Sequence, residues 1–282
     1  IYATRQTGFC MLSSTNVEEA NHLGAVAHLA AIEGSLPFLH FFDGFRTSHE
    51  VNKVQELEDK DILKLVNFDK IKEFKAKMLN VGNNIQKGMN EGEDIYFQSV
   101  EARNELYNKI PDIVNQYMED VNRVTGKNYQ LFNYYGAKDA TNVIVAMGSV
   151  CDTAKLVVED LVKKNEKVGL IEVHLYRPFS VDYLTKVLPE TVKNIAVLDR
   201  TKESGSIGEP LYLDIVAALN NKGINIVGGR YGLSSKNTTP DMIYSVYYML
   251  SHELKNNFTI GITDDVTNLS LESHDYTLDL GY

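Results

Sequence analysis

The sequence predicts an α/β protein with two domains, on three observations. With 282 residues, 44% of them hydrophobic, the chain is long enough for two ordinary cores. From Asn142 onward, short apolar runs alternate with helical patterns, as in a doubly wound and largely parallel sheet with helices on both faces. The part before it holds one β-α-β unit and a charged stretch. We therefore expect one domain with its connector in residues 1–133 and another in residues 134–282.

The first domain begins with two expected strands and one helix. Gly8–Ser13 is a short apolar run, and Leu36–Phe42 is so apolar that it predicts a buried parallel strand. Glu18 follows Thr15 at the spacing of a capping box, which places a helix start there. Gly34 is a suitable residue to end this helix.

A connector rich in Lys, Glu, Asp and Asn follows, between Glu50 and Asn133. Helical spacing of its apolar residues predicts helices at Asp59–Val66, Asp69–Leu79 and Pro111–Thr125. Asn80–Asp94 is rich in Gly and Asn and should be irregular. The connector should wrap the surface rather than form a catalytic core.

The second domain is expected to contain five buried strands with four helices between them. The strands are Val143–Met147, Val168–Val173, Ile195–Leu198, Ile224–Val227 and Phe258–Gly261. The helices are Asp152–Asn165, Val181–Leu188, Pro210–Asn220 and Thr239–Ser251. Crossovers between parallel strands are right-handed, which places helices on both faces of the sheet.

Composition excludes several classes of protein. The net charge of −10 disfavours a nucleic-acid partner, and no apolar run reaches the length of a membrane span. Cys10 and Cys151 stand apart in apolar runs, so we expect reduced, buried thiols in a cytoplasmic protein and no iron–sulfur cluster in this chain. The chain starts at Ile1 rather than Met, which favours a piece cut from a longer protein.

No motif for a nucleotide or a metal is present. Gly148 and Ser149 follow the first strand of the second domain, but neither the dinucleotide fingerprint nor the phosphate loop of nucleotide hydrolases occurs there. Ser149 and Asp152 are better explained as residues that start a helix. We expect this chain to bind no cofactor and no metal.

The loop after the strand at Ile195–Leu198 is the most suggestive local feature. It carries Asp199, Arg200 and Lys202 at the carboxyl end of a buried strand, where open α/β sheets place functional loops. One interpretation is contact with an anion or a partner domain. The equally weighted alternative is a structural loop, in which Asp199 accepts backbone hydrogen bonds and Arg200 pairs with an acid.

Three further candidates lie at strand ends. Arg177 precedes Pro178, which favours extended backbone, and an interdomain salt bridge explains it better than a substrate clamp. Arg46 and His49 follow the second strand and either face an active-site cavity or, the favoured alternative, form hydrogen bonds within their loop. The neighbouring Ser and Asp do not form a hydrolase triad, because no nucleophile elbow is present.

Six strings along the chain resemble one enzyme family. They are Arg5–Phe9, His40–Glu50, Leu175–Phe179, Asp199–Glu203, Gly229–Leu233 and Asp264–Thr267. Together these segments, which appear in order over nearly the whole chain, resemble pyruvate:ferredoxin (flavodoxin) oxidoreductase. The resemblance is therefore more specific than any one motif.

The resemblance implies the following. The family oxidatively decarboxylates pyruvate with coenzyme A to acetyl-CoA and carbon dioxide, and passes electrons through iron–sulfur clusters to ferredoxin or flavodoxin. The full-length enzyme that the resemblance implies as the parent of this chain carries thiamine diphosphate and magnesium. Residues 1–133 resemble the end of the pyrimidine-binding domain plus a connector, and residues 134–282 resemble the transketolase C-terminal domain with a C-terminal extension.

The same resemblance implies a fragment that is inactive alone. Its partners would be the remaining domains of the parent polypeptide, within an expected homodimer. Two alternatives remain at this point. One is a separate subunit of a split 2-oxoacid:ferredoxin oxidoreductase, and the other is a non-catalytic binding module of transketolase-like fold.

Overall fold

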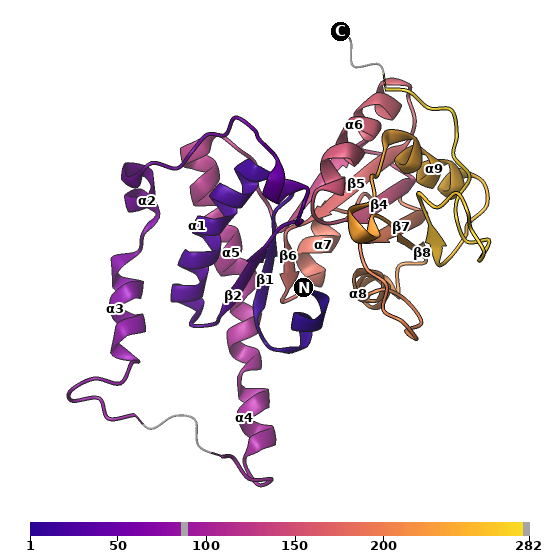
Figure 1. Cartoon of the computed structure of the whole chain (residues 1–282). Coiled ribbons are helices and arrows are strands. Elements are labelled where there is room, and N and C mark those ends of the chain that lie inside the picture. Colours follow the sequence, from indigo (N-terminus) through magenta and orange to yellow (C-terminus); the bar gives the residue numbers. More distant parts are fainter. Residues whose placement is uncertain (86–89, 279–282) are drawn as a thin grey trace.

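The computed structural model describes residues 1–85 and 90–278. Two sheets lie next to each other, a small one in the first part of the chain and a larger one in the second (Figure 1). Among the described residues no helix is long and apolar enough to cross a membrane.

The small sheet has three strands in the order β2-β1-β6. Strands β1 (Cys10–Ser13) and β2 (Phe38–Phe41) are parallel, as predicted, while β6 (Leu175–Arg177) runs antiparallel to β1 and comes from the second half of the sequence. The 3-10 helix η1 (Tyr2–Gln6) precedes β1. Strand β2 is only half-buried, because it forms the edge of the sheet, so the prediction of a buried strand was wrong.

Helix α1 (Val17–Gly34) packs against β2 and against α5 (Asn104–Thr125). Its start lies one residue later than the predicted capping box. Asn16 accepts the amide of Glu19, and the Glu19 carboxylate in turn accepts the amide of Thr15 at 2.7 Å. The capping arrangement is present, but with Asn16 and Glu19 in place of Thr15 and Glu18.

The connector contains η2 (Thr47–His49), α2 (Asp59–Leu65), α3 (Phe68–Ala76) and α4 (Tyr96–Ala102). Two of these helices match the prediction, but α4 was missed. Helix α5 begins seven residues before Pro111, which lies inside it rather than at its start. Of the irregular stretch predicted at Asn80–Asp94, residues 86–89 lie outside the described part of the chain.

The large sheet has six strands in the order β3-β5-β4-β7-β8-β9. They are β3 (Phe132–Gly136), β4 (Asn142–Ala146), β5 (Val168–Val173), β7 (Asn194–Asp199), β8 (Asn225–Arg230) and β9 (Phe258–Thr259). All neighbours are parallel except β3, which pairs antiparallel with β5. The prediction of five strands therefore missed an antiparallel edge strand.

Helices cover both faces of the large sheet, as predicted. Helices α6 (Val150–Lys163) and α9 (Pro240–Ser251) pack on one face, with the apolar cluster around Ile144 and Leu170. Helices α7 (Val181–Val187) and α8 (Pro210–Leu219) contribute to the cluster on the other face. A short 3-10 helix, η3 (Leu233–Ser235), precedes α9.

One apolar core extends through both sheets. The cluster that holds Val143, Val145 and Val197 of the large sheet also holds Met11 and Leu12 of β1, all of them buried. Strand β6 follows β5 after a single residue, so the chain passes directly from the large sheet into the small one. The two sheets are thereby joined by both the backbone and the core.

Candidate functional site: a polar junction between the two sheets

The loop after β2 reaches the large domain through Asp43. The Asp43 carboxylate accepts the Ser149 amide at 2.7 Å and the Ser149 hydroxyl at 2.6 Å, just before α6 begins. A carboxylate at this place satisfies amides that a helix start leaves unpaired and complements the helix dipole. Asp43 also forms a 2.9 Å ion pair with Arg200. Ser149 therefore lies at the start of α6, as predicted, but the side chain that accepts the amide there is Asp43, in the loop after β2.

Two of the predicted cations converge on the turn at η3. Arg46 donates to the Ser235 carbonyl at 2.8 Å and to the Asn237 side chain. Arg200 donates to the Gly232 carbonyl at 3.0 Å and to the Ser235 hydroxyl at 3.1 Å. Arg46 thus reaches across to the second domain, whereas hydrogen bonding within its own loop was the favoured prediction.

A cavity of about 640 Å³ lies at this junction. Its lining includes Arg46, His49, Arg200 and Lys236, together with residues at the starts of α6 and α9. His49 itself contacts its own loop, where its Nδ1 lies 2.8 Å from the Ser48 hydroxyl and its ring stacks on Phe45. The structure therefore brings three predicted residues to one cavity, but their contacts are mainly with protein.

Asp199 and Lys202 lie in the loop after β7. The buried Asp199 carboxylate accepts the amides of Leu211 and Tyr212, each at 3.0 Å, at the start of α8. Burial raises the pKa of Asp199 to about 7, against the lowering effect of these two hydrogen bonds. Lys202 pairs with Glu209 at 3.3 Å. These contacts of Asp199 are the ones that the structural alternative expects, while the Arg200–Asp43 pair also links this loop to the first part of the chain.

Arg177 lies on β6, in the extended backbone that was predicted before Pro178. Its guanidinium pairs with Asp214 of α8 at 3.0 Å and lies over the Tyr176 ring, 4.1 Å from the ring centre. The pair connects a strand of the small sheet with a helix of the large domain.

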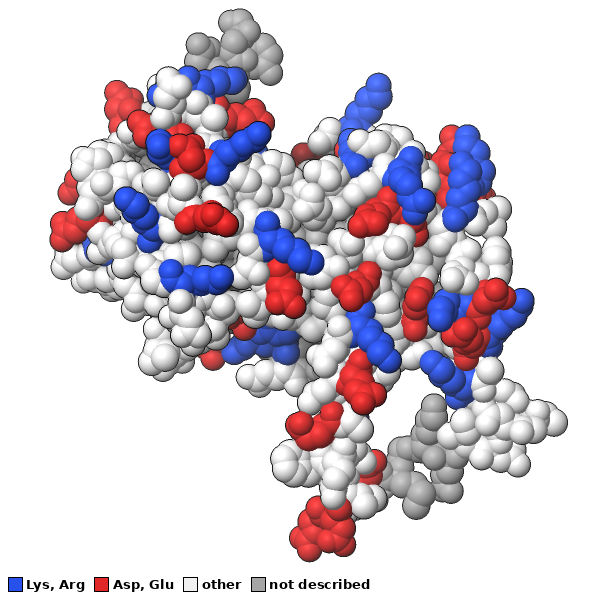
Figure 2. Space-filling model, turned by 180° about the vertical axis from the view of Figure 1, so that it is seen from behind, with Lys and Arg blue, Asp and Glu red and all other residues white. Residues whose placement is uncertain are grey.

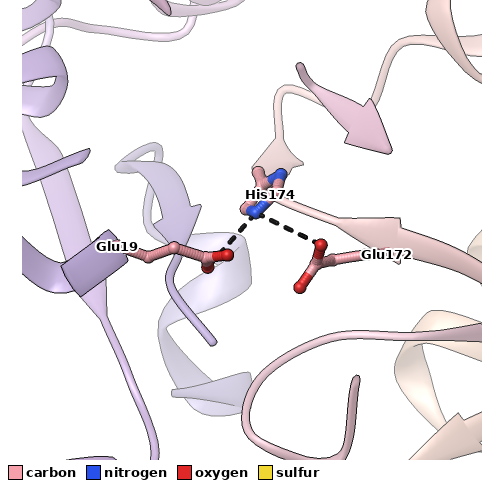
Figure 3. Close-up of side chains that lie close together, drawn as sticks. All are labelled: Glu19, Glu172 and His174. Carbon is pink, nitrogen blue, oxygen red and sulfur yellow. Dashed lines mark hydrogen bonds and ion pairs between the residues drawn. The ribbon is translucent and has the colours of Figure 1, made fainter. Parts of the chain in front are cut away.

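Sequence reasoning missed a buried ionic cluster between the sheets. Figure 3 shows Glu19 from α1 facing Glu172 of β5 and His174, which directly follows β5. His174 Nε2 lies 3.4 Å from Glu19 Oε2 and 3.8 Å from Glu172 Oε2. The other ring nitrogen, Nδ1, donates to the Gln130 carbonyl at 2.8 Å. All three side chains of the cluster are buried.

Lys155 of α6 supplies the balancing charge of this cluster. Its ammonium lies 3.1 Å from Glu172 and 4.0 Å from Glu19. The Thr15 hydroxyl also donates to Glu172, and the Tyr135 hydroxyl does so at 3.1 Å. Every carboxylate of the cluster is therefore paired or hydrogen-bonded, which is the condition for burying charge at tolerable cost.

The contacts in the cluster shift the pKa values of Glu19 and His174. Burial raises the pKa of Glu19, but the hydrogen bond and charge of His174 and the charge of Lys155 outweigh it and bring it to about 2. Burial lowers the pKa of His174, yet the Glu172 and Glu19 carboxylates outweigh it and raise the pKa above its usual value. Both effects favour a charged His174 paired with a charged Glu19.

The cluster has the residue types of a metal site, but its geometry argues against one. The Lys155 ammonium lies 3.1 Å from Glu172 Oε1 and 4.0 Å from Glu19 Oε1, while His174 Nε2 faces the Oε2 atoms, so a metal held by the three side chains would lie close to a fixed positive charge. A fixed cation there competes with a second one by charge repulsion. We therefore interpret the cluster of Glu19, Lys155, Glu172 and His174 as a buried ionic junction between the two sheets, called the buried junction below.

The sequence held a weak signal for this junction. Glu172 interrupts an otherwise apolar strand, and His174 follows it two residues later on the same face. Such a charge in a buried strand demands a partner. The partners lie 153 and 17 residues earlier in the chain, at Glu19 and Lys155, and no local pattern identifies them.

Two family models match the chain in order. Residues 1–119 match "Pyruvate flavodoxin/ferredoxin oxidoreductase, thiamine diP-bdg", and residues 140–243 match "Pyruvate:ferredoxin oxidoreductase core domain II".

Curated relatives match nearly the whole chain. Pyruvate:ferredoxin oxidoreductase of Moorella thermoacetica is 54% identical over 275 residues, which are 96% of this chain and 24% of that protein. Pyruvate-flavodoxin oxidoreductase of Klebsiella pneumoniae is 48% identical over 99% of this chain and 24% of that protein. Pyruvate dehydrogenase [NADP(+)] of Cryptosporidium parvum is 45% identical over 99% of this chain and 15% of that protein.

A solved structure shows the same fold at low identity. It is 2-oxoglutarate:ferredoxin oxidoreductase from Magnetococcus marinus, with a TM-score of 0.50 and 15% identity, over 86% of this chain and 42% of that one. This chain spans about a quarter of the length of the ferredoxin- and flavodoxin-linked relatives. By these matches the chain is homologous to the N-terminal region of the pyruvate:ferredoxin/flavodoxin oxidoreductases.

Proposed function

We propose that this chain is a fragment of an enzyme that oxidatively decarboxylates pyruvate with coenzyme A. The products would be acetyl-CoA and carbon dioxide, and the electrons would pass through iron–sulfur clusters to ferredoxin or flavodoxin. The observation that carries the proposal is the identity of 54% with the Moorella thermoacetica enzyme over 96% of this chain. The ordered match to two family models supports it.

The family is described as binding thiamine diphosphate. The diphosphate is held in proteins through a divalent cation, which needs oxygen ligands with a free face. Among the described residues, one group of three His, Cys, Asp or Glu side chains lies close enough to share an ion, and this group, Glu19, Glu172 and His174, is buried and already contacts the Lys155 ammonium. It does not fit a magnesium diphosphate. We therefore assign the diphosphate and magnesium to the parent polypeptide outside this chain.

The names of the relatives support a role in 2-oxoacid chemistry rather than in choosing the acceptor. Proteins named for ferredoxin, for flavodoxin and for NADP(+) all contain this segment at 44% identity or more. A segment common to all three does not determine the acceptor. Within the enzyme, the polar junction would hold the two domains in a fixed arrangement beside the reaction site.

The proposal includes the surroundings of the chain. Its partners would be the other domains of the same polypeptide, in a homodimer, and its location the cytoplasm. Buried, free Cys10 and Cys151 fit a reducing compartment.

The test compares the full polypeptide with the 282-residue chain. The full polypeptide should release carbon dioxide from pyruvate only when coenzyme A and an electron acceptor such as ferredoxin are present. The 282-residue chain should be inactive, and calorimetric titration with thiamine diphosphate and magnesium should detect no micromolar binding. If the separate 282-residue chain is the natural gene product and restores activity to other subunits, the split-enzyme alternative is correct.

A further inference from the structure

Exposed apolar side chains concentrate in the connector. Of the 23 large hydrophobic side chains exposed among the described residues, ten lie between Ile62 and Leu106. Figure 1 shows that one connector helix, α4, projects away from both sheets at the bottom of the view. Isolated exposed hydrophobics are ordinary, but a concentration of them marks an interaction surface.

Three consecutive residues form the centre of this projection. Ile95, Tyr96 and Phe97 are 55%, 58% and 72% exposed. They lie at the start of α4, whose main contacts are with α5. Isoleucine, tyrosine and phenylalanine together on a projecting segment resemble the anchors at the centres of protein interfaces. We name residues 90–102 the aromatic tip.

The charge of the aromatic tip has one sign. Glu91, Glu93, Asp94 and Glu101 surround the three apolar residues, and no Lys or Arg occurs between Asn90 and Ala102. Figure 2 shows red acidic side chains beside white ones on the segment that projects below the body. An acidic rim around an apolar centre fits a partner with basic residues around an apolar groove.

A second copy of this tip is a poor partner. Tip-to-tip contact between two copies would place the same acids opposite each other, and like charges at close range are repulsive. The net charge of −10 adds to that repulsion. By contrast, about three quarters of the length of these relatives has no counterpart in this chain, which spans 24% of it.

We infer that the aromatic tip docks into an apolar groove with a basic rim, on the part of the parent polypeptide that lies outside residues 1–282. This inference rests on the proposed function, because it requires the longer polypeptide. The tip then acts as an anchor that fixes the N-terminal domain against the rest of the enzyme.

The experiment uses limited proteolysis of the full polypeptide with an endoproteinase specific for Glu. In the 282-residue chain the tip should be cut readily at Glu91 and Glu93. In the full polypeptide these sites should be cut at least ten times more slowly. A photo-reactive phenylalanine analogue that replaces Phe97 in the full polypeptide should crosslink to a peptide of the same molecule outside the segment that corresponds to residues 1–282.

Variants separate docking from a general loss of structure. In the full polypeptide, Tyr96→Ser combined with Phe97→Ser should return cleavage to the rate seen in the 282-residue chain. The control Leu63→Ser removes a side chain with 60% exposure from α2 and should leave the protection intact. Circular dichroism shows whether each variant is folded.

The outcomes are distinct. Unprotected Glu91 and Glu93 in a full polypeptide that turns over pyruvate would overturn the inference and leave the proposed function standing. A crosslink between two polypeptides would assign the tip to the dimer contact and would also overturn it. A full polypeptide without pyruvate activity but with a protected tip would overturn the proposed function alone.

Discussion

Lys155 is the residue on which the charge balance of the buried junction depends. Its ammonium is the cation 3.1 Å from Glu172, a carboxylate with no exposed surface. Removal of one partner from a buried pair leaves an uncompensated charge in a medium that solvates it poorly. We predict that Lys155→Met lowers the free energy of unfolding by about 3 kcal/mol, measured by urea denaturation.

Lys167→Met is the matched control. Lys167 pairs with Asp139 at 2.7 Å, but both side chains are more than half exposed. Exposed pairs contribute about 0–1 kcal/mol, so this variant should change stability little. If both variants lose the same free energy of unfolding, the buried ion pair of Lys155 contributes no more to stability than the exposed ion pair of Lys167.

His174 should make stability depend on pH. Its pKa is raised in the folded state, so its charged form adds stability that is fully present below the unfolded pKa of about 6.5 and is lost as the pH rises through the folded pKa. Glu19 acts at the acid end, since its pKa of about 2 adds stability above about pH 4.5 that is lost as the pH falls toward 2. The destabilisation caused by His174→Gln should therefore be larger at pH 5.5 than well above the folded pKa.

Unfolding curves of wild type and His174→Gln at several pH values between 5.5 and 9 measure this difference. His49→Gln removes an exposed imidazole from a surface loop and controls for the loss of any histidine. A destabilisation by His174→Gln that stays constant over this range would contradict a charged His174 in the junction.

Individual residues were predictable where a local rule applied. Asp199 accepts helix amides and Arg200 pairs with an acid, as one of the two interpretations of their loop stated. The buried junction was not predictable, because Glu19, Lys155 and Glu172 meet only after the two sheets have packed. A short sequence window does not contain that information.

At the scale of elements, α6 depends on a cap from another domain. The Ser149 side chain does not cap its own helix, and Asp43 accepts both the Ser149 amide and its hydroxyl. We predict that Asp43→Ala costs about 1–2 kcal/mol through the lost cap, and further through the lost ion pair with Arg200. Asp43→Asn should cost less, because an amide oxygen still accepts the Ser149 amide.

Hydrogen exchange of the amides at the start of α6 measures this prediction. They should exchange faster in Asp43→Ala, while the amides of α9, which Asp43 does not cap, should change only with global stability. An unchanged exchange rate at Ser149 and Val150 in Asp43→Ala would show that the cap contributes little.

Two elements show why strands are harder to place than helices. The run Leu175–Arg177 is only three residues long, and its partner β1 lies more than 160 positions earlier in the chain. Strand β3 lies at the sheet edge and includes an asparagine, two tyrosines and a glycine, so it lacks the continuous aliphatic run that identified the buried strands. Helix α5 was placed, but its start was predicted seven residues too late, at Pro111. The proline lies inside this 22-residue helix instead of at its first turn.

At the scale of the whole molecule, the shared core decides how the chain unfolds. A half-domain with a free apolar face would open before the large sheet. Instead β1 lies between β2 and β6, with Cys10, Met11 and Leu12 fully buried in the cluster that also holds Val143 and Val145. Its backbone hydrogen bonds are therefore protected by the same core as those of β4.

We predict that β1 and β4 open together and that the connector opens first. Native-state hydrogen exchange of the 282-residue chain should give similar opening free energies for Met11–Leu12 and for Val143–Val145. The amides of α3 and α4 should exchange at lower free energy, because neither helix contains a buried residue. If β1 exchanges as readily as α4 in a monomeric sample, the small sheet behaves as an independent remnant, and the contacts through β6 and the buried junction are too weak to couple the two domains.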